Sequence, residues 1–297
     1  MTRDLAVLIV SYNSGRDVLS CVESLLATND QGLRIIVADN ASPDGSARPI
    51  ADWIRTENAP VELIETGRNG GYAFGVNAAL KVACIDPAIR WFWVLNPDMT
   101  VPEKSLQALR HHLETAVDFS LLGGRVVYAD GSARLQTDGG LVNRWTGVTH
   151  NVNLGASLDA PLPDAVKIDF IMGGNMVASR VFIDAVGPMR EDYFLYYEEV
   201  DWALRRPANL PLAICKDFVV HHAAGTSIGS ATLDRGASPF AQYWKHRARL
   251  KFVGHFNPLG LPIALAWTLA KLLQLGFKGQ GAGGRAMLKG AISGLKP

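Results

Sequence analysis

The chain has 297 residues, 48% hydrophobic and 19% charged, which is enough for one large core or for a domain with an appendage. Its net charge of +1 is unevenly spread. Residues 241–297 contain nine Lys or Arg and no Asp or Glu, whereas the first 240 residues contain 20 and 28. We expect no nucleic acid partner. The basic tail predicts an anionic partner, such as a membrane surface or a polyanion.

The cysteines and the N-terminus carry no targeting or redox signal. Cys21, Cys84 and Cys215 lie far apart and form neither a metal-ligand spacing nor a disulfide framework, so we expect unreactive thiols in a reducing compartment. The first apolar run, at residues 5–10, is too short for a signal peptide and has the pattern of a strand.

The first part of the chain alternates strand and helix patterns. Short apolar runs, typical of strands buried on both faces of a parallel sheet, occur at residues 5–10, 34–38, 61–65 and 91–95. Apolar residues at helical spacing predict helices at residues 18–26, 72–84 and 103–116. This alternation predicts a doubly wound α/β sheet, in which the loops after Val10, Ala38 and Leu95 meet at one ligand crevice.

The alternation of strand and helix patterns becomes irregular from 120 to 170. Residues 168–220 again have regular patterns: a strand, a helix, an acidic cluster and a final strand. Residues 240–256 are basic and aromatic, and no charged residue occurs from Phe252 to Ala270. Pro258 and Pro262 leave a continuous helix shorter than the ~20 residues that a bilayer span needs. An interfacial helix is the preferred interpretation; a buried helix that closes the core and a transmembrane helix are the alternatives.

Two loops have the composition of a nucleotide site. Asp39, followed by Asn40, ends the second predicted strand, where a carboxylate can accept hydrogen bonds from a pyrimidine N–H or a ribose hydroxyl; a plain turn is the alternative. Gly70 and Gly71 permit a close backbone approach to phosphate before a helix, or else form a tight turn with a cap. No Gly-x-Gly-x-x-Gly follows the first strand, which excludes a dinucleotide fingerprint.

Asp98 ends the sequence Leu-Asn-Pro-Asp after the fourth predicted strand. A carboxylate there suits Mg²⁺ or Mn²⁺, which need only one or two protein carboxylates beside diphosphate oxygens; a helix N-cap is the alternative. His221 and His222 follow the last predicted strand. A neutral imidazole there can complete a metal site, and a structural role is the alternative.

Glu198, Glu199 and Asp201 place three carboxylates within four residues, beside large aromatic side chains. Crowded carboxylates next to apolar rings raise one another's pKa and can act as general bases. The alternative is the start of an acidic helix, which the helix dipole favours.

Taken in order, these motifs resemble glycosyltransferase family 2, in particular its rhamnosyltransferase-like branch. The resemblance covers about residues 5–255 and includes the segments SYNS, VADNASPDGS, GRNGGYAFGVN, LNPD, IMGGNMVASR, VGPMREDYFLYYEEVDWALR and HHAAGTS. It implies a GT-A fold, a doubly wound mixed sheet flanked by helices, followed by a basic and apolar helical extension. We expect the enzyme domain at 1–227, with a nucleotide-binding half at about 1–100 and an acceptor half at about 101–227, and the extension at 228–297.

The resemblance also implies the donor and metal sites. Asp39 would contact the nucleotide base, Asp98 matches the last carboxylate of the metal-binding Asp-x-Asp motif, and His222 matches a histidine near metal and diphosphate. Asn96 takes the first position of that motif, which leaves one charged metal ligand. The donor-binding residues expected in full are Tyr12, Asn13, Asp39, Asn40, Asn69, Gly71, Asn77, Asn96 and Asp98.

Glu198 and Glu199 match the family's Glu-Asp pair, whose second member deprotonates the acceptor hydroxyl. Glu replaces Asp at position 199, so Glu199 is the first choice for the base and Asp201 the alternative. The implied mechanism is a single displacement that inverts the anomeric carbon, with Mg²⁺ or Mn²⁺ offsetting the charge on the leaving diphosphate.

We therefore expect an inverting glycosyltransferase that moves a sugar, such as rhamnose, from a dTDP- or UDP-sugar to a glycan or lipid-linked acceptor in cell-surface polysaccharide synthesis. It is expected in the cytoplasm, docked on the anionic inner face of the cytoplasmic membrane through Lys245, Arg247, Arg249 and Lys251. One alternative is a non-catalytic sugar-nucleotide-binding scaffold of the same fold. A nucleotidyltransferase is disfavoured, because Ser-Tyr-Asn-Ser stands where its Gly-rich phosphate loop would be.

Overall fold

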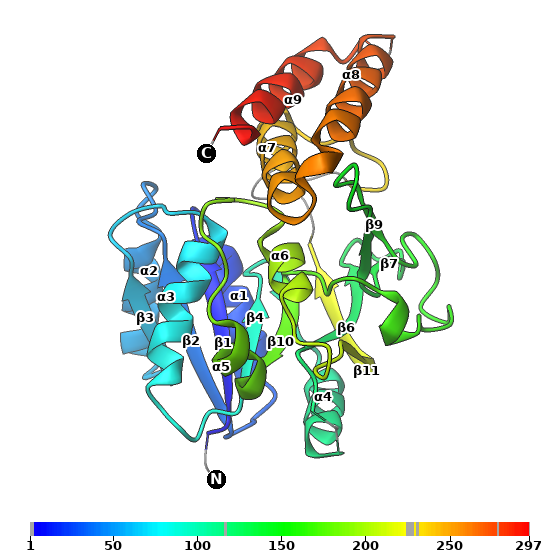
Figure 1. Cartoon of the computed structure of the whole chain (residues 1–297). Coiled ribbons are helices and arrows are strands. Elements are labelled where there is room, and N and C mark those ends of the chain that lie inside the picture. Colours follow the sequence, from blue (N-terminus) through cyan, green and yellow to red (C-terminus); the bar gives the residue numbers. More distant parts are fainter. Residues whose placement is uncertain (1–2, 116–117, 224–228, 230–231, 278, 297) are drawn as a thin grey trace.

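The computed structural model describes residues 3–115, 118–223, 229, 232–277 and 279–296. A central sheet is flanked by helices, and the C-terminal helices stand at one end of the molecule, opposite the N-terminus (Figure 1). The strands are β1 (Leu5–Ser11), β2 (Leu33–Asp39), β3 (Val61–Glu65), β4 (Trp91–Leu95), β5 (Met99–Thr100), β6 (Leu121–Tyr128), β7 (Leu135–Thr137), β8 (Gly140–Val142), β9 (Thr149–Asn151), β10 (Asn175–Ser179) and β11 (Ala213–His222). The helices are α1 (Gly15–Leu26), α2 (Ala47–Thr56), α3 (Tyr72–Cys84), α4 (Glu103–Thr115), η1 (Ala165–Lys167), α5 (Arg180–Val186), α6 (Glu198–Leu204), α7 (Pro239–Phe256), η2 (Pro258–Gly260), α8 (Leu261–Phe277) and α9 (Gly281–Gly294).

The sheet is mixed, and its strand order reverses at one place. Within the described residues the order is β3-β2-β1-β4-β10-β6-β11-β5, with β7 paired to β6. The strands β1 to β4 are parallel, β10 runs antiparallel to its neighbours β4 and β6, and β11 is parallel to β6. The reversal lies between β1 and β4, where an open α/β sheet forms a ligand crevice beyond the carboxyl ends of its strands.

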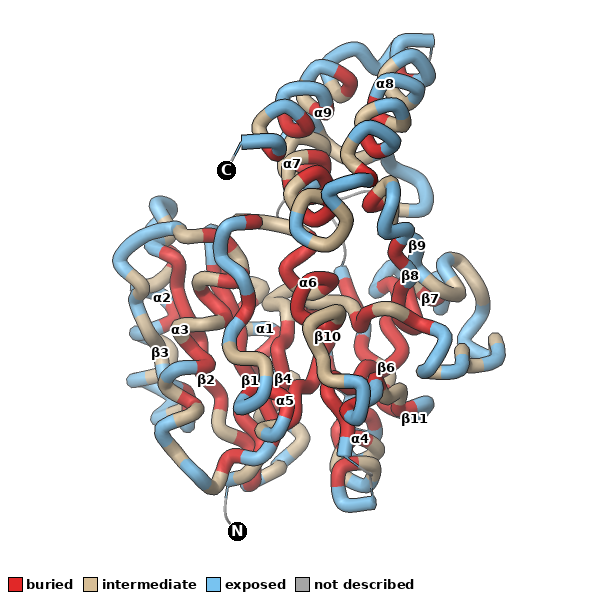
Figure 2. Tube along the Cα trace, in the orientation of Figure 1, coloured by how far each residue is buried: buried red, intermediate tan, exposed pale blue. Residues whose placement is uncertain are grey.

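The strands β1 and β4 are buried along their whole length (Figure 2), because the sheet has a core on each face. Along β1, Ala6, Leu8 and Val10 join the core under α3 and α6, and the alternate side chains join the core under α1 and α4. This period of two explains why the run at residues 5–10 has no polar position. The predicted strands at 5–10, 34–38, 61–65 and 91–95 all form. The helix α2 and the short strands between 130 and 151 were not predicted.

The C-terminal segment divides into a packed part and an exposed part. Ala248, Leu250, Phe252 and Val253 of α7 belong to the same core as α3 and α6. By contrast, α8 buries only Ala264, Thr268 and Leu275. The alternative of a buried helix that closes the core is therefore wrong for α8. The expected domain boundary between 227 and 228 lies outside the described residues.

Candidate active site

Polar groups gather at the carboxyl end of β4, beside the reversal in strand order. Oδ1 of Asn96 accepts a hydrogen bond from the hydroxyl of Tyr72 (2.8 Å), and the same hydroxyl lies 3.0 Å from the carbonyl oxygen of Gly173. The backbone N–H of Asn96 donates to the carbonyl of Gly174 (2.9 Å). These contacts join α3, β4 and the loop before β10 at one place.

Asp98 lies in the turn between β4 and β5, with 10% of its side chain exposed. Pairing of β5 with β11 sets His222 beside it, with Nε2 3.1 Å from Oδ1 of Asp98. That oxygen is buried and has no hydrogen-bond partner among the described residues. Nδ1 of His222 contacts Oε1 of Gln136, which accepts only. Nδ1 therefore faces the amide oxygen of Gln136, and Nε2 faces the carboxylate of Asp98.

A buried carboxylate oxygen beside an imidazole nitrogen is a suitable pair of ligand atoms for a divalent cation. Adjacent ligands of an octahedral ion, bonded at about 2.1 Å, stand about 3 Å apart, close to the separation of these two atoms. Gln136 supplies the outer hydrogen bond that orients a ligating histidine. No group of three or more His, Cys, Asp or Glu side chains converges in the described part of the chain. The residues thus fit one ion whose other ligands are water or phosphate oxygens.

The second cluster is the pair of glutamates that begins α6. Burial, and then the charge of Glu199, raise the pKa of Glu198 to about 8, so Glu198 is mostly protonated at neutral pH. Burial also raises the pKa of Glu199, while nearby backbone N–H groups and then Lys245 favour its ionised form. Glu199 is half-buried and reachable, whereas Glu198 is buried. The pair can therefore hold one proton on the buried member and present the other as a carboxylate.

The two clusters face the same tyrosine. Burial, followed by the negative charges of Glu198, Glu199 and Asp98, raises the pKa of Tyr72 well above its usual value. The tyrosine hydroxyl therefore stays protonated between the acidic pair and the Asp98 carboxylate, and can donate a hydrogen bond there.

Asp201 has a different environment from its two neighbours. Its side chain is fully buried, Oδ1 accepts from Nε of Arg205 (2.6 Å), and Oδ2 accepts from the hydroxyl of Tyr193 (3.0 Å). Both oxygens are thus held by the protein's own donors. Of the two candidates for the base, this geometry favours Glu199.

The chain enters α6 through an unusual backbone. Phe194, Tyr196 and Tyr197 have φ values of 68°, 70° and 71°, a left-handed conformation that costs roughly 1–3 kcal/mol for each such residue. Neighbouring segments hold it: the Phe194 ring stacks on Trp244 of α7 (4.2 Å), and the Tyr197 hydroxyl donates to the carbonyl of Gly147. The strained run fixes where α6 begins, and with it the position of the two glutamates.

Gly71 also supports this run. Its φ is +94°, and the N–H of the next residue, Tyr72, donates to the carbonyl of Phe194 (2.8 Å). A Cβ at position 71 would lie 2.2 Å from that carbonyl oxygen. The sequence predicts that the backbone at Gly71 comes close to a phosphate. In this structure it comes close to the backbone of Phe194. The role of Gly71 toward a phosphate stays a prediction.

We expect Gly71→Ala to lower the free energy of unfolding by about 1–3 kcal/mol more than Gly67→Ala, because the added methyl group forces two backbones apart. Gly67 is a matched control, since it also has positive φ (76°) but open space around its Cα. Urea denaturation of both variants measures the difference. Equal losses would show that the approach to Phe194 does not constrain residue 71.

The remaining donor-site candidates lie along the ends of β1, β2 and β3. Asp39 is buried, and its two oxygens accept hydrogen bonds from the N–H (2.9 Å) and hydroxyl (2.6 Å) of Ser42. The side chain of Asn40 is held between Gly71 and Thr66. Asp39 and Asn40 therefore brace the loops at this edge.

Tyr12, Asn13 and Asn69 are exposed at the same edge and open to a ligand. Asn77 lies further along α3, where its amide bonds both the N–H (3.0 Å) and the carbonyl (2.9 Å) of Met189. It ties α3 to the segment that leads into the acidic cluster. The donor role of each of these residues stays a prediction.

The cations expected to bind a membrane are mostly used inside the protein. Arg247 donates to the carbonyls of residues 192 and 193 (3.0 and 2.9 Å), Lys251 pairs with Asp192 (3.4 Å), and Arg249 is buried. Lys245 is exposed, but its charge acts on Glu199. This part of the prediction is corrected: α7 packs on the loop before α6, so Arg247, Arg249 and Lys251 are not available to lipid.

Sequence reasoning missed three residues of the site. Tyr72 stands directly after the paired glycines, and an aromatic hydroxyl at a helix start beside a ligand loop was a usable signal. Gln136 lies in a stretch without a readable pattern, and Lys245 was taken only as one of several basic residues. Both come from segments far from the motifs they contact, so local patterns did not point to them.

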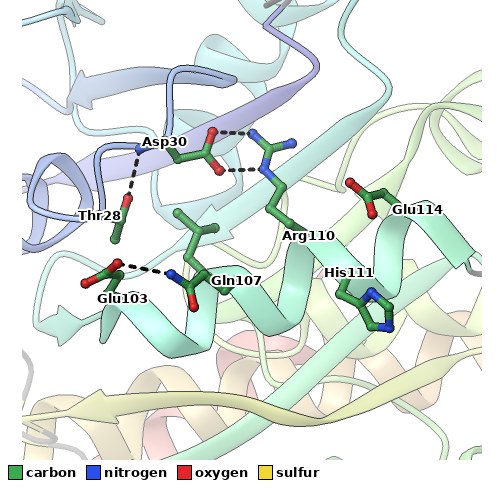
Figure 3. Close-up of a pocket in the computed structure, with 8 residues that line it drawn as sticks. Thr28, Asp30, Glu103, Gln107, Arg110, His111 and Glu114 are labelled. Carbon is green, nitrogen blue, oxygen red and sulfur yellow. Dashed lines mark hydrogen bonds and ion pairs between the residues drawn. The ribbon is translucent and has the colours of Figure 1, made fainter.

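A separate cavity of about 250 Å³ lies between α4 and the loop after α1 (Figure 3). Arg110 occupies its wall and pairs with Asp30 (2.6 Å) and with Asp4 (2.6 Å). None of the residues discussed above lines this cavity. The charge of Arg110 is compensated within the fold, and we assign the cavity no role in catalysis.

Comparison with known proteins gives the family. The model for Glycosyl transferase family 2 matches residues 6–166. The low-salt glycan biosynthesis hexosyltransferase Agl10 of Haloferax volcanii is 22% identical over 226 residues, 73% of this chain and 66% of that protein. The N-acetylglucosaminyl-diphospho-decaprenol L-rhamnosyltransferase of Mycobacterium tuberculosis is 28% identical over 300 residues, 93% of this chain and 92% of that protein. The chain belongs to glycosyltransferase family 2.

Solved structures give the fold. The mannosyltransferase PcManGT of Pyrobaculum calidifontis, in complex with GDP-Man and Mn²⁺, has a TM-score of 0.61 at 14% identity, covering 99% of this chain and 88% of that one. GalNAc-T7 with UDP, GalNAc and Mn²⁺ has a TM-score of 0.60 at 15% identity; this chain is covered to 85% and spans about half (48%) of that protein. The predicted GT-A fold with a C-terminal helical segment is confirmed.

Proposed function

We propose that this chain transfers a sugar from a nucleotide-diphosphate donor to a hydroxyl of a glycan or lipid-linked acceptor, with inversion at the anomeric carbon. The observation that carries the proposal is the meeting of two unlike polar groups at the end of β4. One is the unpartnered Asp98 oxygen facing His222, and the other is the pair Glu198 and Glu199. The first suits a diphosphate with a divalent ion, and the second suits deprotonation of a hydroxyl. Glycosyltransferase activity is also supported by the family and the relatives.

In the proposed reaction the Glu199 carboxylate takes the proton of the acceptor hydroxyl while the acceptor oxygen attacks the anomeric carbon. The bond from that carbon to the donor phosphate oxygen breaks on the opposite face, and the nucleotide diphosphate leaves with the electron pair. Glu198 keeps its proton, because its raised pKa disfavours a second charge beside Glu199. When bound by Asp98 and His222, Mg²⁺ or Mn²⁺ supplies positive charge that offsets the charge on the leaving diphosphate.

The donor is proposed to lie along the ends of β1 and β3, where Tyr12, Asn13 and Asn69 are exposed. The sugar of the proposed donor is a deoxyhexose such as rhamnose, and its carrier is dTDP or UDP. The support is the similarity to the rhamnosyltransferase of M. tuberculosis, whose name also states a diphospho-decaprenol acceptor. The proposed setting is cell-surface polysaccharide synthesis at the cytoplasmic face of the membrane.

A donor screen tests the proposal. The purified chain is mixed with UDP-, dTDP- and GDP-sugars, with and without Mn²⁺ or Mg²⁺. Calorimetry measures binding, and nucleotide release measures hydrolysis or transfer to N-acetylglucosaminyl-diphospho-lipid. We expect one donor to bind in a metal-dependent way and to be consumed. Binding without turnover of any donor would favour the non-catalytic scaffold, and the absence of all binding would refute the proposal.

A further inference from the structure

The outer face of α8 is apolar and uncovered. Among the described residues, the helical stretch Pro258–Phe277 is long and apolar enough to cross a membrane, yet only 22% of its apolar window is buried. Figure 2 shows α8 largely exposed at the end of the molecule away from the N-terminus, with the neighbouring α9 exposed along part of its surface. The exposed side chains recur at mostly helical spacing: Leu259 (81%), Ile263 (47%), Leu269 (58%), Leu273 (66%) and Phe277 (92%). A row of this kind is rare on a protein that meets only water.

The neighbouring helix carries the matching charge. On α9, Arg285 and Lys289 are exposed beside Leu288 and Ile292. No Asp or Glu occurs anywhere in residues 241–297, so this end of the molecule has no group that repels an anionic surface. Exposed apolar side chains together with basic ones, without acids, favour an anionic bilayer surface over a second protein of mixed charge.

We propose that α8 and α9 form a membrane-docking surface, in which α8 lies in the plane of an anionic bilayer interface with its outer row among the acyl chains. The driving force is burial of the apolar row on α8, and the cations of α9 add attraction to anionic headgroups. This differs from docking through the cations of α7, three of which the fold occupies. The proposal does not rest on the proposed reaction.

Contacts of the inner face of α8 show why the helix lies flat instead of spanning. Arg249 of α7 is buried there, donating to the carbonyl of Ala264 and the hydroxyl of Thr268, with its guanidinium over the Trp267 ring. Ala264, Trp267 and Thr268 lie at the middle of the 20-residue stretch. A spanning α8 would carry this arginine toward the bilayer centre, at a cost of about 2.5–3.5 kcal/mol or more. Lying flat keeps the contact on the protein side.

Vesicle flotation of the whole chain tests the surface. Phosphatidylcholine vesicles with phosphatidylglycerol are compared with phosphatidylcholine alone, using wild type, Leu269→Glu/Leu273→Glu and the control Ile85→Glu/Val166→Glu. The control makes the same chemical change at exposed apolar positions (78% and 83%) of the sheet domain. We expect wild type and control to float with anionic vesicles. The α8 variant should lose at least about tenfold in binding.

The proposal is overturned if the α8 variant floats with anionic vesicles as well as wild type does, or if wild type does not float with them. Carbonate at high pH should release the wild type, since retention would mean that α8 spans. A loss of self-association in the α8 variant by light scattering, without vesicle binding by wild type, would assign the surface to a second copy of the chain. None of these readouts depends on sugar transfer, so the proposed function can stand or fall separately.

Discussion

Glu199→Gln is expected to reduce the rate of sugar transfer by about 10²–10⁴-fold, the usual loss when a general base is removed. Gln keeps the shape of the side chain but cannot take the acceptor proton. Donor affinity, measured by calorimetry, should change little. Steady-state kinetics at saturating donor give the fall in kcat. An unchanged kcat would remove Glu199 from the role of base and return the question to Asp201.

Glu198→Gln is the matched comparison and should keep most of the activity, because Glu198 is already mostly protonated. Its folded-state pKa of about 8 lies above the usual 4.5, so the folded protein binds the extra proton between these values. The contribution of Glu198 to the free energy of unfolding therefore falls as the pH rises through that range. Gln at position 198 does not titrate, so the variant does not lose stability as the pH rises from 4.5 to about 8. Its Tm should therefore exceed that of wild type at pH 8 and match it below pH 4.5.

The same environment sets the pH dependence of the rate. Transfer should slow as pH falls through the pKa of Glu199, which burial raises and the charge of Lys245 lowers. Lys245→Gln removes that charge, so the acid limb of the pH–rate profile should move to higher pH. Lys104→Gln, at an exposed position on α4, is the control. An acid limb that stays in place would show that Lys245 does not act on the base.

Asp98→Asn is expected to abolish metal-dependent binding of nucleotide diphosphate, because it removes the charged member of the proposed pair of metal ligands. Calorimetric titration of UDP and dTDP with and without Mn²⁺ measures this without any turnover. Asp184→Asn, an exposed position on α5, is the control and should behave as wild type. Retained Mn²⁺ dependence in Asp98→Asn would place the ion elsewhere.

Gln136→Leu extends this test to the outer hydrogen bond on His222. Loss of such a partner typically costs about 10–100-fold in metal affinity or activity, so the effect should be smaller than that of Asp98→Asn. The order of the two effects identifies which residue binds the ion and which one orients its ligand.

The sequence predicted the features that local patterns encode. The apolar runs of β1, β2 and β4 are largely buried on both faces, so each was readable without its neighbours; β3, at the edge of the sheet, is mostly half-buried or exposed. Asp98 and the two glutamates could be singled out because their motifs follow or begin regular elements, and their roles stay predictions. The antiparallel insertion of β10 between β4 and β6 was not predicted, since nothing in its five residues states which strands it pairs with.

The unpredicted part of the site depends on long-range contacts. Gln136 reaches His222 across 86 positions, in a stretch of loops and short strands that carry no periodic signal. The basic residues of α7 were read as surface charge because composition does not show which side of a helix is covered. Arg249 illustrates the error, because its burial depends on α8, which follows it in the chain.

The left-handed run before α6 has a consequence for the timing of assembly during synthesis. Its residues leave the ribosome well before α7, the helix that supplies Trp244 and Arg247 to hold it. A growing chain can therefore form β1 to β4 while the segment before the glutamates lacks its support. We infer that the order of translation separates the two halves of the proposed site: the proposed donor edge can form before the proposed base has a fixed position.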